Sequence, residues 1–146
     1  MKRFAFKLEK VRRLRSWTEE EARLELGRVT SERNAIENEL RLSAERRVKA
    51  MNLNFESAQT ISTRRVAEAY FSRLDAEKER LINEAAKVDI QVEAAREVWR
   101  TAKTELQSLD NLKERRLTEF RKTRLAAEES ELNDIRPQNR DSSRQR

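Results

Sequence analysis

The sequence contains neither cysteine nor histidine, and its 146 residues include one glycine, Gly27, and one proline, Pro137. The absence of thiols and imidazoles excludes thiol catalysis, disulfides, zinc fingers and the commonest metal ligand. Turns depend on glycine and proline to reach unusual backbone angles, so two such residues cannot separate many elements. We therefore expect a few long elements, and neither a cofactor nor a metal site.

Charged residues make up 41% of the chain and hydrophobic ones 36%. Such a composition cannot fill a wide core, but it can supply the narrow apolar stripe of a two-helix seam. No apolar run approaches the roughly 20 residues of a membrane span, and the basic N-terminus lacks the apolar stretch of a secretion signal. We expect a soluble, non-exported protein. It also has no glycine-rich phosphate loop and no plausible nucleophile, so we expect no enzyme.

The net charge of +6 is concentrated at one end of the sequence. Residues 1–15 hold seven basic side chains and one acidic one, and the rest of the chain carries 26 of each. Nucleic-acid-binding helices usually show a longer basic stripe, so this distribution argues against a nucleic-acid partner.

The clearest periodicity lies in the second half of the chain. Nine uncharged residues follow a strict 4-3-4-3 spacing: Leu81, Ala85, Val88, Val92, Ala95, Trp99, Ala102, Leu106 and Leu109. This spacing is typical of a coiled-coil seam. Continuing it gives Lys113, Arg116 and Phe120, and two cations would be costly on a buried seam. We expect the closed two-helix structure to end there.

The first half shows a less regular stripe. Its members are Leu8, Val11, Ala22, Leu26, Val29, Arg33, Ile36 and Leu40, with successive four-residue steps through Thr18, Ala22 and Leu26 that should unwind the supercoil locally. The apolar spacing continues through Val48, Met51, Phe55 and Ala58. Gly27 lies inside this helix, either as a tolerated defect or at a close approach of two helices.

The two stripes fade at residues 57–63, an uncharged stretch rich in serine and threonine, where we place a turn. Helix one then spans about 4–57 and helix two about 63–134, with Ser62 or Thr63 as its cap. Asn52–Asn54 is the alternative turn. Residues 1–135 are thus predicted to form one all-α antiparallel coiled-coil hairpin, followed by a disordered basic tail at 136–146.

The predicted helices differ in length, since each residue adds about 1.5 Å. Folding the chain near residue 60 brings Phe4 level with about residue 116. The basic N-terminus and an unpaired stretch of helix two should therefore lie together, opposite the turn.

At this point the sequence resembles a known family, the flagellar export protein FliJ. The resemblance rests on four groups of residues: F-x-F-x-L-E-K-V-x-x-L-R (Phe4 to Arg15), E-E-E-A-R-L-E-L-G (Glu19 to Gly27), Tyr70-x-x-x-Leu74, and Val98-Trp99-Arg100 with L-x-x-L-x-x-L-K-E-R-R (Leu106 to Arg116). Each group is weak alone, but together they span most of the chain in family order.

The resemblance implies an antiparallel coiled coil similar to the γ stalk of rotary ATPases, in the flagellar type III export apparatus. Implied partners are the hexameric export ATPase and its regulator, the cytoplasmic domain of the export gate, and export chaperones. The implied location is the cytoplasm, peripherally at the inner face of the cell membrane. The end with both termini would enter the ATPase ring, through Arg3, Lys7, Lys10, Arg13, Arg115, Arg116 and Phe120.

The resemblance also implies a contact between the turn-side half and the export gate. Tyr70 and Leu74 match the family's aromatic and aliphatic positions on helix two. On helix one the family's aromatic positions fall on Ser43, Arg46 or neighbouring polar residues, which puts the usual chemistry of that contact in doubt.

Three alternatives stay open. The first is the equivalent stalk of a virulence type III secretion system. The second is a membrane-surface helix, because Phe4, Phe6, Leu8, Val11, Leu14 and Trp17 lie among basic residues. The third is a generic structural coiled coil.

Overall fold

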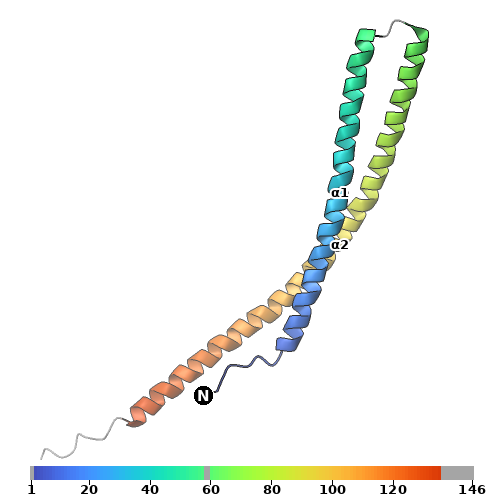
Figure 1. Cartoon of the computed structure of the whole chain (residues 1–146). Coiled ribbons are helices and arrows are strands. Elements are labelled where there is room, and N and C mark those ends of the chain that lie inside the picture. Colours follow the sequence, from blue (N-terminus) through green and yellow to red (C-terminus); the bar gives the residue numbers. More distant parts are fainter. Residues whose placement is uncertain (1, 58–59, 136–146) are drawn as a thin grey trace, which may run out of the picture. The chain divides into compact units, whose positions relative to one another are not determined.

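The computed structural model describes residues 2–57 and 60–135, without the side chains of residues 54–57. It contains two helices, α1 (Glu9–Ser57, 49 residues) and α2 (Ile61–Ile135, 75 residues) (Figure 1). No strand occurs in the described ranges. The predicted all-α antiparallel hairpin is confirmed. The tail at 136–146 and turn residues 58 and 59 lie outside the described residues.

The contacts group the chain into two compact units. The terminal unit combines Met1–Ser16 with Thr104–Arg146, and the turn unit is Trp17–Lys103. That residues 1–135 form one domain stays a prediction.

In the turn unit, α1 and α2 pack along a seam, the row of side chains at which the two helices meet. On α2 the predicted stripe is confirmed, since Leu81, Ala85, Val88 and Ala102 are buried. On α1, Ala22 and Val29 are buried opposite them. Small seam residues allow the close approach of two helices that a thin core needs.

Ion pairs across the seam fix the direction of the two helices. Arg33 Nε lies 2.6 Å from Asp89 Oδ1. Fourteen residues further along α1, Arg47 pairs with Asp75, which lies fourteen residues earlier in α2. Fourteen residues are two heptads, so the partners advance and recede in step, as an antiparallel coiled coil requires.

The stripe predicted for the end of α1 was wrong at Val48 and Met51, and its other members, the Phe55 side chain and Ala58, lie outside the described residues. Val48 and Met51 are 57% and 50% exposed, whereas Ser43 is 4% exposed and takes the seam position. Arg47 and Ala50 follow it at the heptad spacing and are half-buried. The heptad phase set upstream persists here, although polar residues, Ser43 and Arg47, occupy two of its positions.

The expected four-residue step through Thr18 was also wrong. Thr18 is exposed, and Glu19 lies half-buried in its place. The Glu19 carboxylate accepts a hydrogen bond from Trp99 Nε1 at 3.0 Å, and Lys103 Nζ lies 4.9 Å from the indole ring centroid. A polar partner thus accommodates the large indole at the seam.

Helix α1 begins at Glu9 rather than near Phe4, because residues 2–6 are not helical. In an extended segment, residues two apart point to one side, so Phe4 and Phe6 can both face α2; on a helix they would diverge. Phe6 is buried, and the Phe4 ring lies 5.6 Å from that of Phe120.

Helix α2 begins at Ile61, and its cap is Thr60 rather than Ser62 or Thr63. The Thr60 N–H donates to Thr63 Oγ1 at 3.3 Å, and the Thr63 hydroxyl donates to the Thr60 carbonyl at 2.7 Å. The Thr63 side chain thus satisfies the Thr60 N–H, which corresponds to one half of a capping box.

Candidate functional site

Two surfaces of the described chain offer themselves to partners. The first is the basic surface of the terminal unit, made of six exposed cations: Arg3, Lys7, Lys10, Arg13, Arg115 and Arg116. The second is the turn groove, a pocket in the turn unit between the end of α1 and the start of α2. Each is considered below from its residues upward.

The start of α1 is joined to α2 by a cluster of charges within the terminal unit. Glu9 accepts hydrogen bonds from Arg12 Nη2 at 2.8 Å and from Lys113 Nζ at 3.0 Å. Arg12 also reaches Asp110 Oδ1 at 3.3 Å. Lys113 therefore stands at the seam beside a carboxylate, which removes most of the cost expected for a cation there.

The cations around Glu9 change its protonation. Hydrogen bonds from Arg12 and then Lys113 lower the pKa of Glu9 from 4.5 to about 2, because they stabilise the charged carboxylate. The same contact raises the pKa of Arg12. Glu9 is thus a structural carboxylate, and it holds the first turn of α1 against α2.

Most cations of the basic surface are not engaged inside the chain. Arg13 lies 3.7 Å from Glu9, and Arg116 covers the Phe6 ring at 5.8 Å from its centroid. Arg3, Lys7, Lys10 and Arg115 form no ion pair with a described side chain. The structure places all six predicted residues in one unit, and four of them form neither an ion pair nor a ring contact with a described side chain.

The seventh predicted residue of this surface, Phe120, is half-buried under Phe4. Its ring is already in contact inside the chain, so it supports the N-terminal segment. Arg116 is exposed and does not lie on the seam as its spacing suggested.

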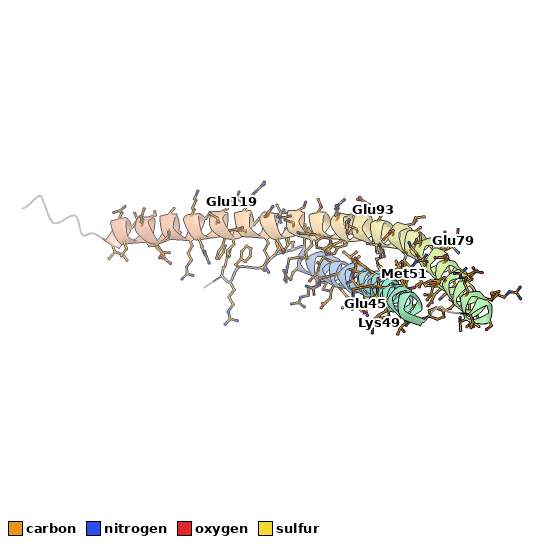
Figure 2. All side chains as sticks on the ribbon, turned by 90° about the horizontal axis from the view of Figure 1, so that it is seen from above. Glu45, Lys49, Met51, Glu79, Glu93 and Glu119 are labelled. Atoms are coloured by element: carbon orange, nitrogen blue, oxygen red, sulfur yellow. The ribbon has the colours of Figure 1, made fainter. Side chains whose placement is uncertain are left out.

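Beyond Phe120, α2 has no partner helix among the described residues, and every side chain from 121 to 135 is exposed (Figure 2). Leu125, Leu132 and Ile135 lie in this stretch at seven- and three-residue spacing. Sequence reasoning predicted the unpaired stretch but did not single out these three residues. The heptad spacing of these three residues is the feature of the sequence that could have identified them.

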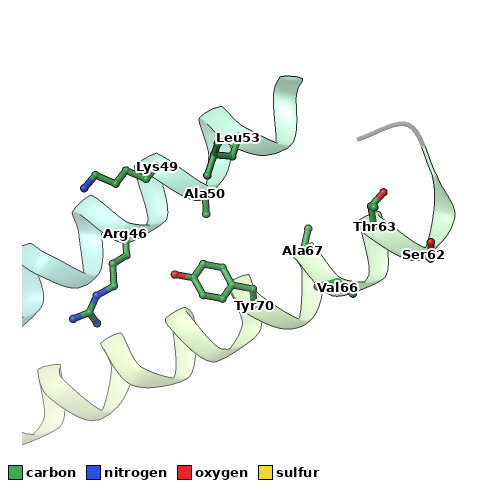
Figure 3. Close-up of a pocket in the computed structure, with 9 residues that line it drawn as sticks. All are labelled: Arg46, Lys49, Ala50, Leu53, Ser62, Thr63, Val66, Ala67 and Tyr70. Carbon is green, nitrogen blue, oxygen red and sulfur yellow. The ribbon is translucent and has the colours of Figure 1, made fainter. Parts of the chain in front are cut away.

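The turn groove has a volume of about 630 Å³ and is open to solvent. Its α1 wall consists of Arg46, Lys49, Ala50 and Leu53, and its α2 wall of Ser62, Thr63, Val66, Ala67 and Tyr70 (Figure 3). The helices diverge toward the turn (Figure 1). The side chains of the two walls therefore leave a groove between them (Figure 3).

The two residues predicted for the gate contact have different surroundings. Tyr70 is 41% exposed and lines the turn groove. Leu74 is 5% exposed, and its side chain belongs to the seam. Leu74 lies on the same face of α2 as Tyr70 but one helical turn further from the groove, where α1 covers it, so its side chain offers little surface to a partner.

Ser43 and Arg46, the positions on helix one where the family's aromatic residues fall, also differ in their surroundings. Ser43 is buried in the seam, whereas Arg46 lines the groove and lies 3.6 Å from Glu77. Sequence reasoning missed the other groove residues, because exposed residues such as Val66 and Leu53 belong to no seam pattern.

Nothing in the described chain indicates a catalytic or metal centre. Within residues 2–57 and 60–135, no three acidic side chains gather closely enough to hold a metal ion. In the same ranges, no helix has the length and apolar character that crossing a membrane requires.

Comparison with known proteins places the chain in a family. The sequence profile of the family described as flagellar FliJ protein matches residues 4–138. No curated protein and no solved structure matches the chain at a significant level. The match covers nearly the whole sequence, including the turn groove and every residue of the basic surface except Arg3. The chain therefore belongs to the flagellar FliJ protein family and is a component of flagellar type III export.

Proposed function

We propose that the chain links the hexameric export ATPase to the export gate, with its terminal unit engaging the ATPase and its turn unit facing the gate. The observation that carries this proposal is the gathering of six exposed cations beside an unpaired helix in one unit. Complementary charge speeds and orients docking, and a single helix is slender enough to enter the opening of a ring.

The balance of charge differs between the two units. Residues 1–16 and 104–146 contain 17 basic and 10 acidic residues, whereas residues 17–103 contain 16 and 17. In the turn unit, some of the cations are neutralised along one helix, as in the pairs of Arg28 with Glu25 and Arg100 with Glu97. In the terminal unit, Arg3, Lys7 and Lys10 lack such neighbours among the described side chains. Their charge is therefore free to attract acidic groups of a partner, most strongly at low salt.

The test is binding to the purified export ATPase and stimulation of its ATP hydrolysis. The double variant Lys7→Glu/Lys10→Glu should lose both, because it places acidic groups on the docking surface. The matched control Lys78→Glu/Lys87→Glu makes the same charge change on exposed residues of the turn unit and should keep both. Equal behaviour of the two variants would rule the docking surface out.

Direct binding to lipid is the second candidate, and the packing of the N-terminal segment weakens it. Phe6 is buried and Phe4 packs on Phe120, so two of the aromatic side chains expected to enter a bilayer already contact the protein. Flotation of the purified chain with anionic vesicles should leave it in the unbound fraction; flotation that depends on residues 1–17 would favour the lipid reading instead.

A further inference from the structure

The turn groove exposes more apolar surface than a solvated helix pair needs. On its α1 wall, Leu53 is 65% exposed, and on its α2 wall, Val66 is 71% exposed. Ala50, Ala67 and the Tyr70 ring lie between them (Figure 3). Contiguous apolar surface rimmed by polar groups marks an interaction site more often than scattered exposed residues do.

The groove is set in a basic stretch of the chain. Residues 46–73 contain six basic and two acidic side chains. Two of the basic ones already face carboxylates, in the pairs of Arg46 with Glu77 and Arg47 with Asp75. The remaining four form no ion pair with a described side chain: Lys49, Arg64, Arg65 and Arg73. Of these four, Lys49 lines the groove, so a partner that covers the apolar walls would meet its positive charge there.

The secondary structure of the two walls determines which kind of peptide segment can bind in the groove. Both are α-helices whose backbone groups are paired within the helix, so the groove has no free strand edge to which an extended peptide could add. A furrow between two diverging helices accepts the ridge of a third helix, whose side chains at three- and four-residue spacing enter between theirs. A third helix here would bury the apolar side chains of the groove, as α1 and α2 bury each other's side chains along the seam.

We propose that the turn groove binds an amphipathic helix of a partner protein, with carboxylates flanking its apolar stripe, and that this helix completes a three-helix bundle. Lys49 would meet the carboxylates, while Leu53, Val66 and Tyr70 would receive the apolar side chains. The identity of the partner as a protein on the gate side rests on the function proposed above, but the binding chemistry does not.

Two other occupants fit the groove less well. A second copy of the chain would bring one basic stretch of residues 46–73 against another, and like charges repel. A lipid surface is flat and would suit a convex patch, whereas the apolar side chains here line a concave pocket.

Tyr70 provides a specific reporter, because it is the only tyrosine in the sequence and lies in the groove wall. The full chain labelled with 3-fluorotyrosine gives one ¹⁹F resonance. The probe is a designed peptide of three heptads with leucine at the seam positions and glutamate beside them. We expect a saturable shift of the resonance that weakens as salt is added. A peptide with lysine in place of each glutamate should bind at least about tenfold more weakly, a difference within the reach of one or two charge pairs.

Matched variants locate the binding. Val66→Asp and Lys49→Glu should each weaken the acidic peptide about tenfold or more. Val98→Asp and Lys87→Glu make the same changes at exposed positions outside the groove and should leave the affinity unchanged. Circular dichroism and thermal unfolding check that each variant retains the fold, and Lys49→Glu keeps the test valid should Val66→Asp disturb the turn.

Several outcomes would overturn the proposal. These are no binding, equal binding of the lysine peptide, and equal affinities of the groove variants and their controls. A resonance that shifts with chain concentration alone would assign the groove to a second copy, and a shift caused by anionic vesicles would assign it to lipid. Loss of ATPase binding by Lys7→Glu/Lys10→Glu is measured separately, so either proposal can fail while the other stands.

Discussion

The Glu9 carboxylate anchors the start of α1, where the surrounding cations would otherwise repel one another. It is surrounded by Arg12, Arg13 and Lys113, and it accepts hydrogen bonds from two of them. Its negative charge near the N-terminus of α1 also interacts favourably with the helix dipole. The terminal unit can therefore hold many cations at its surface and still close α1 onto α2.

The lowered pKa of Glu9 predicts a specific dependence of stability on pH. Because the folded pKa is about 2 and the ordinary value is 4.5, Glu9 stabilises the fold above about pH 4.5, and this contribution is lost as the pH falls toward 2. The wild-type chain should therefore exceed Glu9→Gln in unfolding free energy at pH 6, and the difference should shrink by pH 2. Urea unfolding at several pH values measures it.

The control is Glu39→Gln, at an exposed position without an ion pair among the described side chains. It should change the stability little at pH 6. A difference between wild type and Glu9→Gln that stays constant from pH 6 to pH 2 would contradict the role given to Glu9.

Gly27 offers a second test at the residue scale. A Cβ atom built on Gly27 meets nothing within 4 Å, so the glycine does not serve a close approach of the helices and is a tolerated defect. Gly27→Ala should therefore raise the free energy of unfolding by about 1 kcal/mol, the difference in helix propensity. Gly27→Ser should give a smaller gain in the same urea titrations. A loss of stability with alanine would reveal a contact that the structure does not have.

At the scale of the element, the two helices differ in how fully their sequences predict them. On α2, uncharged residues occupy the seam from Leu81 to Leu109 without interruption, so the hydrophobic spacing predicts it correctly. On α1, polar residues take several seam positions: Ser43 is buried there, and Glu19, Arg33 and Arg47 contact Trp99, Asp89 and Asp75 of α2. A pattern search that follows apolar residues then drifts out of phase, which is why Val48 and Met51 were misplaced.

Two leucines, one buried in the seam and one exposed, give a quantitative prediction of stability. Leu81 is 4% exposed and Leu24 is 66% exposed, although both lie inside helices. Leu81→Ala should cost about 2–5 kcal/mol of unfolding free energy, because it leaves a cavity in a thin core. Leu24→Ala should stay within about 0.5 kcal/mol. Similar losses for both variants would mean that the helices pair through another face.

At the scale of the whole molecule, the sequence reveals charge more readily than shape. The excess of basic residues before residue 16 is visible without any structure, and the structure places those residues with Arg115 and Arg116 in one unit. The turn groove could not be predicted, because it depends on where α1 and α2 diverge rather than on a repeat. Tyr70 was found through the family resemblance, and Leu74 came with it although the heptad phase buries it.

The central claim is that separate surfaces of one chain serve the ATPase and the gate. Its most direct test is recovery of the tagged chain from cells of the organism that encodes it, followed by identification of the proteins that accompany it. We predict that the wild-type chain brings down both the export ATPase and the gate protein, whereas Lys7→Glu/Lys10→Glu loses the ATPase and keeps the gate. Recovery of neither protein with the wild-type chain, or loss of both with the variant while its fold is intact, would contradict the claim.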